Sequence, residues 1–147
     1  MKQLSNKEIH EINGKIHAAF CASDFFSKKD KVFFDGKLMV KNKTTLFAYV
    51  PEFIPTLHNL LKNNFLKTIT IDMNAVKFIV NGADIMRPGI VAFDELKKDE
   101  IIAIVDEKNR KPLAVGKALV SSDEMKKLDK GKVVKNLHWI GDEIWRG

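Results

Sequence analysis

The side chains that could bind a metal or carry acid–base chemistry are few: four histidines and one cysteine in 147 residues. His10 and His17 lie seven residues apart and share a face of a predicted helix, but no third ligand is spaced to join them. His138 stands beside Trp139 in an apolar segment, which is typical of a buried, hydrogen-bonded histidine. Cys21, the single cysteine, is expected to be a small core residue. We therefore expect no metal and no cofactor.

No pattern typical of an enzyme active site occurs. The sequence lacks a Gly-x-x-x-x-Gly-Lys phosphate loop, a Gly-x-Ser-x-Gly nucleophile turn and a Cys-x-x-Cys pair. The acidic pairs Asp94-Glu95 and Asp99-Glu100 flank two lysines, and mixed charge of this kind usually only solvates a surface turn. We expect no catalytic residue and a protein that is not an enzyme.

The segment from Gly82 to Gly89, which reads Gly-Ala-Asp-Ile-Met-Arg-Pro-Gly, is the strongest candidate for ligand binding. Glycine allows positive φ and the close approach of another backbone, and Pro88 followed by glycine favours a fixed turn. The phosphate or sugar of a ligand could then lie against exposed main-chain amides. A tight corner of a barrel is the alternative interpretation of the same residues.

Positive charge is spread unevenly along the chain. Lysine and arginine number 25 against 19 acidic residues, and the net charge of +6 favours an anionic partner such as nucleic acid. Residues 1–68 hold 11 basic and 6 acidic residues, whereas residues 69–147 hold 14 and 13, so the excess lies in the first half. One lysine run in the second half forms either an RNA contact or an exposed helix and turn: Lys126, Lys127, Lys130, Lys132 and Lys135.

The hydropathy pattern gives no sign of a membrane protein. No apolar run approaches the ~18 residues that a membrane span needs. The first residues lack the apolar core of a signal peptide. We expect a cytoplasmic protein with no membrane partner.

The first half carries signals for both helix and sheet. Ser5 and Glu8 have capping-box spacing, and apolar residues at three- and four-residue steps predict a helix over 6–20. Asp35-Gly36 lies between two apolar runs and predicts a β-hairpin, with a further strand over 46–50.

A second helix is expected to begin near Pro55, so that residues 1–66 read as one small α+β domain. Core packing is the main interpretation of its many phenylalanines, because a domain this small needs large side chains to bury enough area. The alternative is an exposed surface for a partner protein, with Phe25-Phe26 as the candidates. The eight phenylalanines are Phe20, Phe25, Phe26, Phe33, Phe34, Phe47, Phe53 and Phe65.

From residue 67 onward the chain changes to short apolar strands separated by glycine, proline and charged turns. A short helix that buries Val76, Ile79 and Val80 is expected to end at Gly82. The run over 101–105 is apolar at every position, which favours a closed, barrel-like sheet. Strands are expected over 69–71, 90–93, 101–105, 113–120, 133–140 and 143–146, with one further helix over 122–128.

These features resemble the PUA domain, the RNA-binding module named after pseudouridine synthases and archaeosine transglycosylases. The likeness covers Ala75–Val80, Gly82–Gly89, Pro112–Gly116 and the closing segment. It implies an α+β fold: a small N-terminal pre-PUA domain (1–66), then a PUA pseudo-barrel (67–147) of short, mostly antiparallel strands with two short helices. Members place the helix, the glycine turn and the final strand against RNA. Carried over, this predicts RNA contacts at Lys77, Gly82, Ala83, Asp84, Arg87, Pro88, Gly89, Trp145 and Arg146.

A likeness over nearly the whole chain is to the translation-factor family of the malignant T-cell-amplified sequence protein and the N-terminal half of ligatin. Pro55-Thr56-Leu57, Ala75–Gly89 and the segment from Asn136 to Trp145 carry this resemblance. It implies binding to the small ribosomal subunit or to tRNA, with rRNA or tRNA as the bound RNA, in initiation, re-initiation or recycling, and with an initiation-factor-like partner protein.

Three other functions stay open at this point. A pre-PUA domain followed by a PUA domain also resembles one group of ribosome-assembly factors. A protein-interaction adaptor would use the first domain for docking, and an RNA-modifying subunit would require a pocket of converging ionisable groups. The sequence determines neither the RNA, nor the partner protein, nor the oligomeric state.

Overall fold

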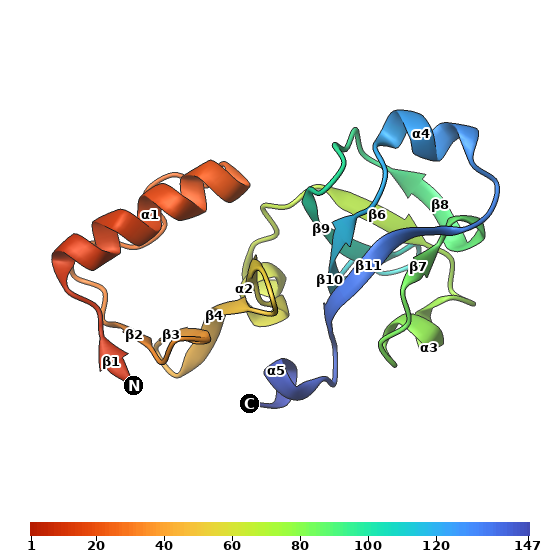
Figure 1. The fold of residues 1–147 in the computed structure, drawn as a ribbon. Coiled ribbons are helices and arrows are strands. Elements are labelled where there is room, and N and C mark those ends of the chain that lie inside the picture. Colours follow the sequence, from red (N-terminus) through yellow and green to blue (C-terminus); the bar gives the residue numbers. More distant parts are fainter.

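The computed structural model describes residues 1–147 and contains two sheets with helix α2 between them (Figure 1). In the N-terminal sheet the five strands follow one another in chain order, and each neighbouring pair is antiparallel. The elements of this half are α1 (Asn6–Phe20), α2 (Leu57–Lys62), β1 (Lys2–Gln3), β2 (Val32–Phe34), β3 (Leu38–Lys41), β4 (Thr44–Tyr49) and β5 (Phe53–Pro55).

Helix α1 begins and ends as local chemistry dictates. The Ser5 hydroxyl accepts from the Glu8 N–H at 3.2 Å while the Glu8 carboxylate accepts from the Ser5 N–H at 3.0 Å, which confirms the capping box. The helix buries Ile9 and Ile16 against the sheet. Cys21 ends it in the left-handed region at φ 59° and is exposed, so the expectation of a core cysteine was wrong.

Phe47 on β4 is the centre of the N-terminal core. It is fully buried and packs against Phe20, Phe25, Phe26 and Phe53, with ring centroids 4.9–6.2 Å apart. The core interpretation is therefore confirmed for all of the eight phenylalanines except Phe33, which is half-buried and belongs to neither core cluster. The alternative of a partner surface at Phe25-Phe26 was wrong, because Phe26 is buried and Phe25 lies edge-on to the Phe47 ring.

The predicted hairpin is present as β2 and β3, and the Asp35 carboxylate closes its turn by accepting from the Lys37 and Leu38 amides. Helix α2 begins later than predicted. Pro55 is the last residue of β5, and Thr56 is the N-cap, whose hydroxyl accepts from the Asn59 N–H at 3.3 Å.

The C-terminal sheet has the strand order β7-β11-β10-β9-β6-β8, and all its pairs are antiparallel except β6 with β9. The two edge strands, β7 and β8, are joined directly by the 3₁₀ turn Arg87–Gly89, so the sheet is almost closed. The predicted α+β fold with a PUA pseudo-barrel is confirmed. The elements are β6 (Thr68–Ile71), α3 (Val76–Ile79), β7 (Ile85–Met86), β8 (Ile90–Phe93), β9 (Ile101–Asp106), β10 (Pro112–Ala118), α4 (Ser122–Lys127), β11 (Lys132–Trp139) and α5 (Glu143–Arg146).

Strand β9 is buried on both faces, which explains its uninterrupted apolar run. Ile102 and Ile104 point into the barrel core, whereas Ala103 belongs to the core of the N-terminal sheet. Val115 of β10 and Leu137 of β11 join that same N-terminal core. The two sheets therefore share buried surface, and the division at residue 66 stays a prediction.

The segment 143–146 was expected to be a strand and is a helix, α5. Gly141 leaves the sheet at φ +94°, and the Asp142 carboxylate then accepts from the Trp145 N–H at 2.8 Å as an N-cap. The C-terminal half thus has three short α-helices where two were expected.

None of the helices is both long and apolar enough to cross a membrane.

Candidate functional site

The segment singled out in the sequence, Gly82–Gly89, folds beside α3 on one face of the barrel (Figure 1). The Asp72 carboxylate accepts from the Ala75 N–H at 3.0 Å and fixes the turn that leads into α3. After the helix, the Ala83 N–H donates back to the Phe78 carbonyl at 3.0 Å. The helix and the glycine turn therefore form one compact unit.

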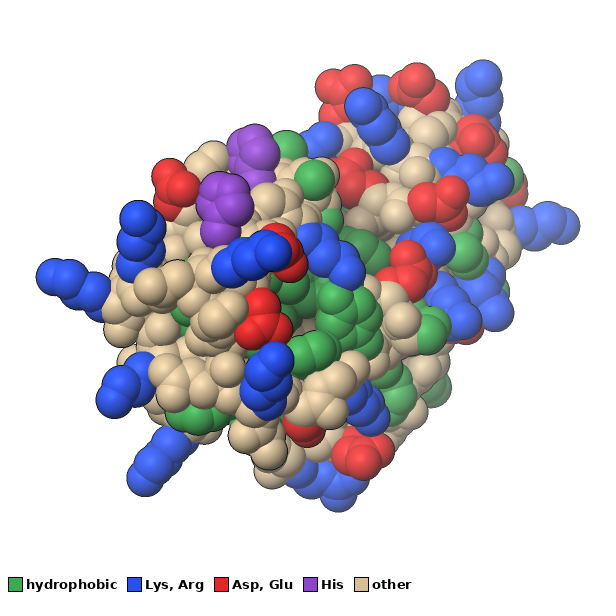
Figure 2. Space-filling view, turned by 60° about the vertical axis from the view of Figure 1, so that its left-hand side comes forward, with side chains coloured by type: hydrophobic (Ala, Val, Ile, Leu, Met, Phe, Trp, Pro, Cys, Tyr) green, Lys and Arg blue, Asp and Glu red, His purple; other side chains and the backbone are tan.

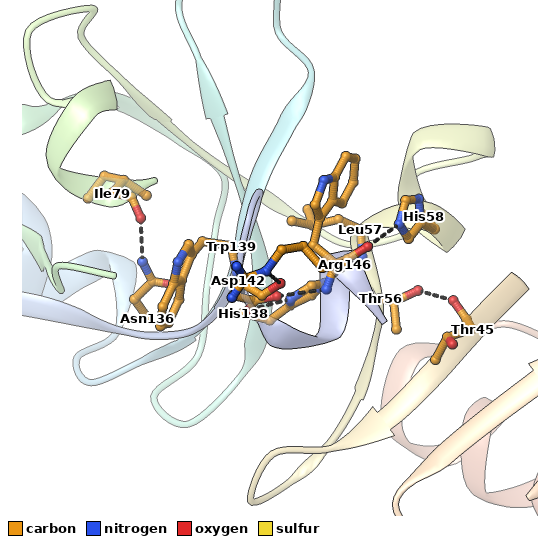
Figure 3. Close-up of polar contacts among 11 residues, drawn as sticks. Thr45, Thr56, Leu57, His58, Ile79, Asn136, His138, Trp139, Asp142 and Arg146 are labelled. Atoms are coloured by element: carbon orange, nitrogen blue, oxygen red, sulfur yellow. Dashed lines mark hydrogen bonds and ion pairs between the residues drawn. The ribbon is translucent and has the colours of Figure 1, made fainter. Parts of the chain in front are cut away.

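Asn136 of β11 fastens this unit to the barrel (Figure 3). Its side-chain amide donates to the carbonyls of Ile79 and Ala83, both at 3.0 Å, and so joins the end of α3 to the turn. Its own N–H donates to Asp84 Oδ1 at 2.8 Å. A buried amide with these bonds holds the turn in one position.

Asp84 and Arg87, two of the predicted RNA contacts, are both engaged within the protein. Asp84 forms an ion pair with Lys132 at 2.9 Å; burial alone would raise its pKa, but the Asn136 N–H and Lys132 hold it below its usual value. Arg87 donates from Nε to the Met125 carbonyl at 2.8 Å and lies over the Phe93 ring. Both side chains support the turn.

Gly82 lies against the ring of Trp139. It has φ +94°, and a Cβ at this position would stand 2.8 Å from Trp139 Cζ2. Only glycine fits both conditions without displacement of the ring.

A pocket of about 480 Å³ lies between α3 and the glycine turn. Its lining is mainly apolar, and Phe78 at its edge is 57% exposed, with Lys77 Nζ 5.2 Å from the centre of its ring. An apolar hollow with a few polar groups suits a flat organic ring, and an exposed phenylalanine can stack on one. The lining residues are Ile71, Asp72, Asn74, Ala75, Phe78, Ile79, Ala83, Asp84, Ile85, Met86, Pro88 and Gly89.

The predicted site residues separate into two groups. Lys77 and the residues from Gly82 to Gly89 surround or support the pocket described above. Trp145 and Arg146 lie on α5, where the Trp145 ring stacks on His58 of α2 with centroids 4.1 Å apart, beside the N-terminal sheet.

Phe78, Asn136 and Trp139 were not predicted as site residues. For Asn136 a signal was available: an amide inside an apolar strand must find buried partners. The exposure of Phe78 had no such signal, because a phenylalanine on a short helix is equally typical of core packing.

His138 is a structural residue, as predicted. It is fully buried, its Nδ1 lies 2.7 Å from Asp142 Oδ2, and its Nε2 accepts from the Leu57 N–H of α2 at 3.0 Å (Figure 3). Because Nε2 accepts, the proton is on Nδ1 and the ring is neutral. Burial outweighs the Asp142 carboxylate and holds the pKa of His138 below its usual value.

Comparisons with known proteins show which family and which relatives this chain resembles. The PUA domain family matches residues 67–140. An uncharacterized protein of Methanocaldococcus jannaschii is 39% identical over 97% of this chain and 93% of its own length. Translation machinery-associated protein 20 of Eremothecium gossypii is 36% identical over 72% of this chain and 63% of its own. Malignant T-cell-amplified sequence 1-A of Xenopus laevis is 35% identical over 63% and 54%.

Two solved structures extend the comparison. A hypothetical protein from Pyrococcus horikoshii OT3 has a TM-score of 0.81 at 32% identity, over 99% of this chain and 97% of its own. An H/ACA RNP bound to a substrate RNA contains a chain with a TM-score of 0.52 at 28% identity, over 63% of this chain and 28% of its own.

The chain belongs to the PUA domain family. Among its relatives are translation machinery-associated protein 20 and malignant T-cell-amplified sequence 1, which confirms the resemblance seen in the sequence. The chain spans about half to two-thirds of the length of those two relatives.

Proposed function

We propose that this chain is a non-catalytic RNA-binding protein of the translation machinery, which acts in the cytoplasm on the small ribosomal subunit or tRNA during initiation, re-initiation or recycling. The names of its relatives and the RNA-bound H/ACA neighbour support this proposal. An initiation-factor-like protein is the proposed partner.

The observation that carries the proposal is the apolar pocket between α3 and the glycine turn, with Phe78 exposed at its edge. An unpaired base would occupy the pocket and stack on Phe78, and its sugar and phosphate would lie against the main chain at Gly82, Ala83, Pro88 and Gly89. Lys77 would contact a neighbouring phosphate. Asp84 and Arg87 would act indirectly, since both hold the turn in place.

The distribution of charge supports the same proposal. In Figure 2 lysine and arginine side chains project around the nearer part of the molecule, whereas acidic and basic side chains are intermixed at the far end. The basic N-terminal half would supply long-range attraction, and the nearly neutral C-terminal half would supply shape recognition.

Binding of a fluorescently labelled single-stranded RNA to Phe78→Ala tests the proposal. Loss of one stacked base should weaken affinity by about 1–3 kcal/mol, roughly 5- to 150-fold. Val91→Ala is the matched control, because Val91 is 51% exposed on β8 and does not line the pocket. Affinity that is the same for both variants and the wild type would contradict the proposal.

Sedimentation of the tagged protein then separates a role in translation from one in ribosome assembly. Co-migration with small subunits supports the proposal. Co-migration with precursors of the large subunit would replace it with an assembly function.

A further inference from the structure

A second pocket, of about 250 Å³, lies where the two halves of the chain meet. Three segments far apart in the sequence form it: the β3–β4 turn with the start of β4, helix α2 and helix α5. Its lining contains three basic side chains, Lys43, His58 and Arg146, and no acidic side chain. The remaining lining residues are Thr44, Thr45, Ile144, Trp145 and Gly147.

The two permanent charges of this pocket, on Lys43 and Arg146, are not neutralised by acidic side chains of the protein. Lys43 and Arg146 are exposed, and neither forms an ion pair with an Asp or Glu side chain. Arg146 donates only from Nε, to the Asp142 carbonyl at 3.3 Å, so its two terminal nitrogens stay available. Most other polar side chains near this junction have protein partners, as Asp142 and Thr56 do.

The framework around these charges is fixed. Asn42 and Lys43 both have positive φ, at 53° and 63°, which makes a tight turn that presents Lys43. Elsewhere in the lining the His58 ring stacks on Trp145, and His58 Nε2 lies 3.0 Å from the Trp145 carbonyl, so this nitrogen carries the proton and donates. The stack holds α5, and with it Arg146, against α2.

We propose that this junction pocket is a phosphate-binding subsite that takes a phosphodiester group of the RNA backbone. Lys43 supplies a point charge and Arg146 a planar pair of donors, while Thr44 and Thr45 add hydroxyl groups. The subsite rests on the proposed RNA-binding function and extends it to the N-terminal half. It gives the excess positive charge of that half a specific point of contact.

The junction pocket and the glycine turn lie on either side of the end of β11 (Figure 3). Figure 3 shows Ile79 and Asn136 on one side of the end of β11, and His58 and Thr45 on the other, with Trp139 and Asp142 between them. Trp139 contacts Gly82, and Asp142 caps α5. The two pockets are therefore linked through the residues at the end of β11.

The test compares two double variants of the full chain with the same change in net charge. Lys43→Ala with Arg146→Ala removes the subsite, and Lys28→Ala with Lys29→Ala removes two exposed lysines from the loop after α1, away from the pocket lining. For a labelled single-stranded RNA, the first should bind about tenfold more weakly than the wild type. Its slope of log affinity against log salt should become shallower by about 0.7 per lost phosphate contact.

The control pair should lose clearly less affinity. Equal losses and equal slopes for the two pairs would overturn the subsite, while normal binding by the wild type would leave the proposed function standing. Absence of RNA binding by the wild type would overturn both.

A measurement without RNA separates local binding from a general effect of charge. In amide NMR spectra, addition of inorganic phosphate should shift the signals of Thr44 and Thr45 in the wild type and not in the Lys43→Ala, Arg146→Ala variant. Shifts scattered over other lysine-rich segments, with none at the two threonines, would also overturn the subsite.

Discussion

At Gly82 the chain combines a positive φ of +94° with a close approach to the ring of Trp139. These two constraints have separate costs: a side chain at positive φ strains the backbone, and a Cβ displaces the ring. Trp139 is the last residue of β11, and Asp142, the N-cap of α5, follows three residues later. Gly82 therefore packs against the end of β11 from which the chain enters α5.

Gly82→Ala should therefore destabilise the protein more than Gly36→Ala. Gly36 has almost the same backbone, φ +96°, but its Cβ would meet nothing within 4 Å. The strain alone should cost about 1–2 kcal/mol in both variants. The clash should add about 1–3 kcal/mol in Gly82→Ala. Urea unfolding measures both; equal losses would show that Trp139 moves aside freely.

Residue types in the sequence predicted the glycine turn but not the bonds that its side chains make. The glycines and proline of the turn predicted its position, since few other residues adopt such a backbone. Asp84 and Arg87 were predicted as RNA contacts, and in the structure they bond to Asn136, Lys132 and Met125. These partners lie 38–52 residues away along the chain, beyond what local spacing can reveal.

At the scale of elements, most helices and strands followed from periodicity, capping residues and turn residues. The elements that were missed or wrongly assigned are those whose structure depends on tertiary contacts. Strands β1 and β5 have only two and three residues and exist because a neighbour pairs with them. At α5 the sequence Gly141-Asp142-Glu143 carried a helix-start signal, but the apolar residues after it were interpreted as a strand.

The uninterrupted apolar run of β9 predicted a barrel correctly for an incomplete reason. A barrel requires only the inward face to be apolar. The outward residue Ala103 is buried because the N-terminal sheet covers it, together with Val115 and Leu137. The apolar run of β9 therefore also reflects the packing of the N-terminal sheet against the outer face of the barrel.

His138 joins helices α2 and α5 to β11, and the contribution of this contact to the free energy of unfolding should depend on pH. The pKa of His138 is held below its usual 6.5 by burial, so protonation favours the unfolded chain. Stability from this residue is complete above about pH 6.5 and should fall as the pH decreases below that value, by at most about 1.4 kcal/mol per pH unit. A charged ring would also lose the bond from the Leu57 N–H.

Urea unfolding at several pH values checks this dependence. His138→Gln should flatten it, whereas His10→Gln, which changes an exposed histidine of α1, should not. An unchanged dependence in His138→Gln would assign the acid sensitivity to other groups.

For the whole molecule, the shared core bears on how the two halves divide the work. The sequence predicted separate domains at 1–66 and 67–147, with attraction from the first and shape recognition from the second. Since Ala103, Val115 and Leu137 are covered by the N-terminal core, removal of the first 66 residues would expose apolar surface of the barrel. Charge variants of the full chain therefore test the RNA contribution of the first half better than truncation does.

The same shared core predicts that the two halves unfold together. Phe47 is fully buried at the centre of the N-terminal cluster, and Phe47→Ala should cost about 3–5 kcal/mol through lost packing and the cavity left behind. Trp139 packs against the barrel cluster, whereas Trp145 stacks on His58 of α2 and packs against the N-terminal cluster. In a Trp145→Phe background the fluorescence of Trp139 therefore reports on the barrel. If unfolding is cooperative, the substitution lowers the urea midpoint seen by fluorescence as much as the midpoint seen by far-ultraviolet circular dichroism.

Leu61→Ala, at a residue 40% exposed on α2, should move both midpoints only slightly. A fluorescence midpoint that stays at the wild-type value in Phe47→Ala would instead show that the barrel is stable without the N-terminal core, and would support the division at residue 66.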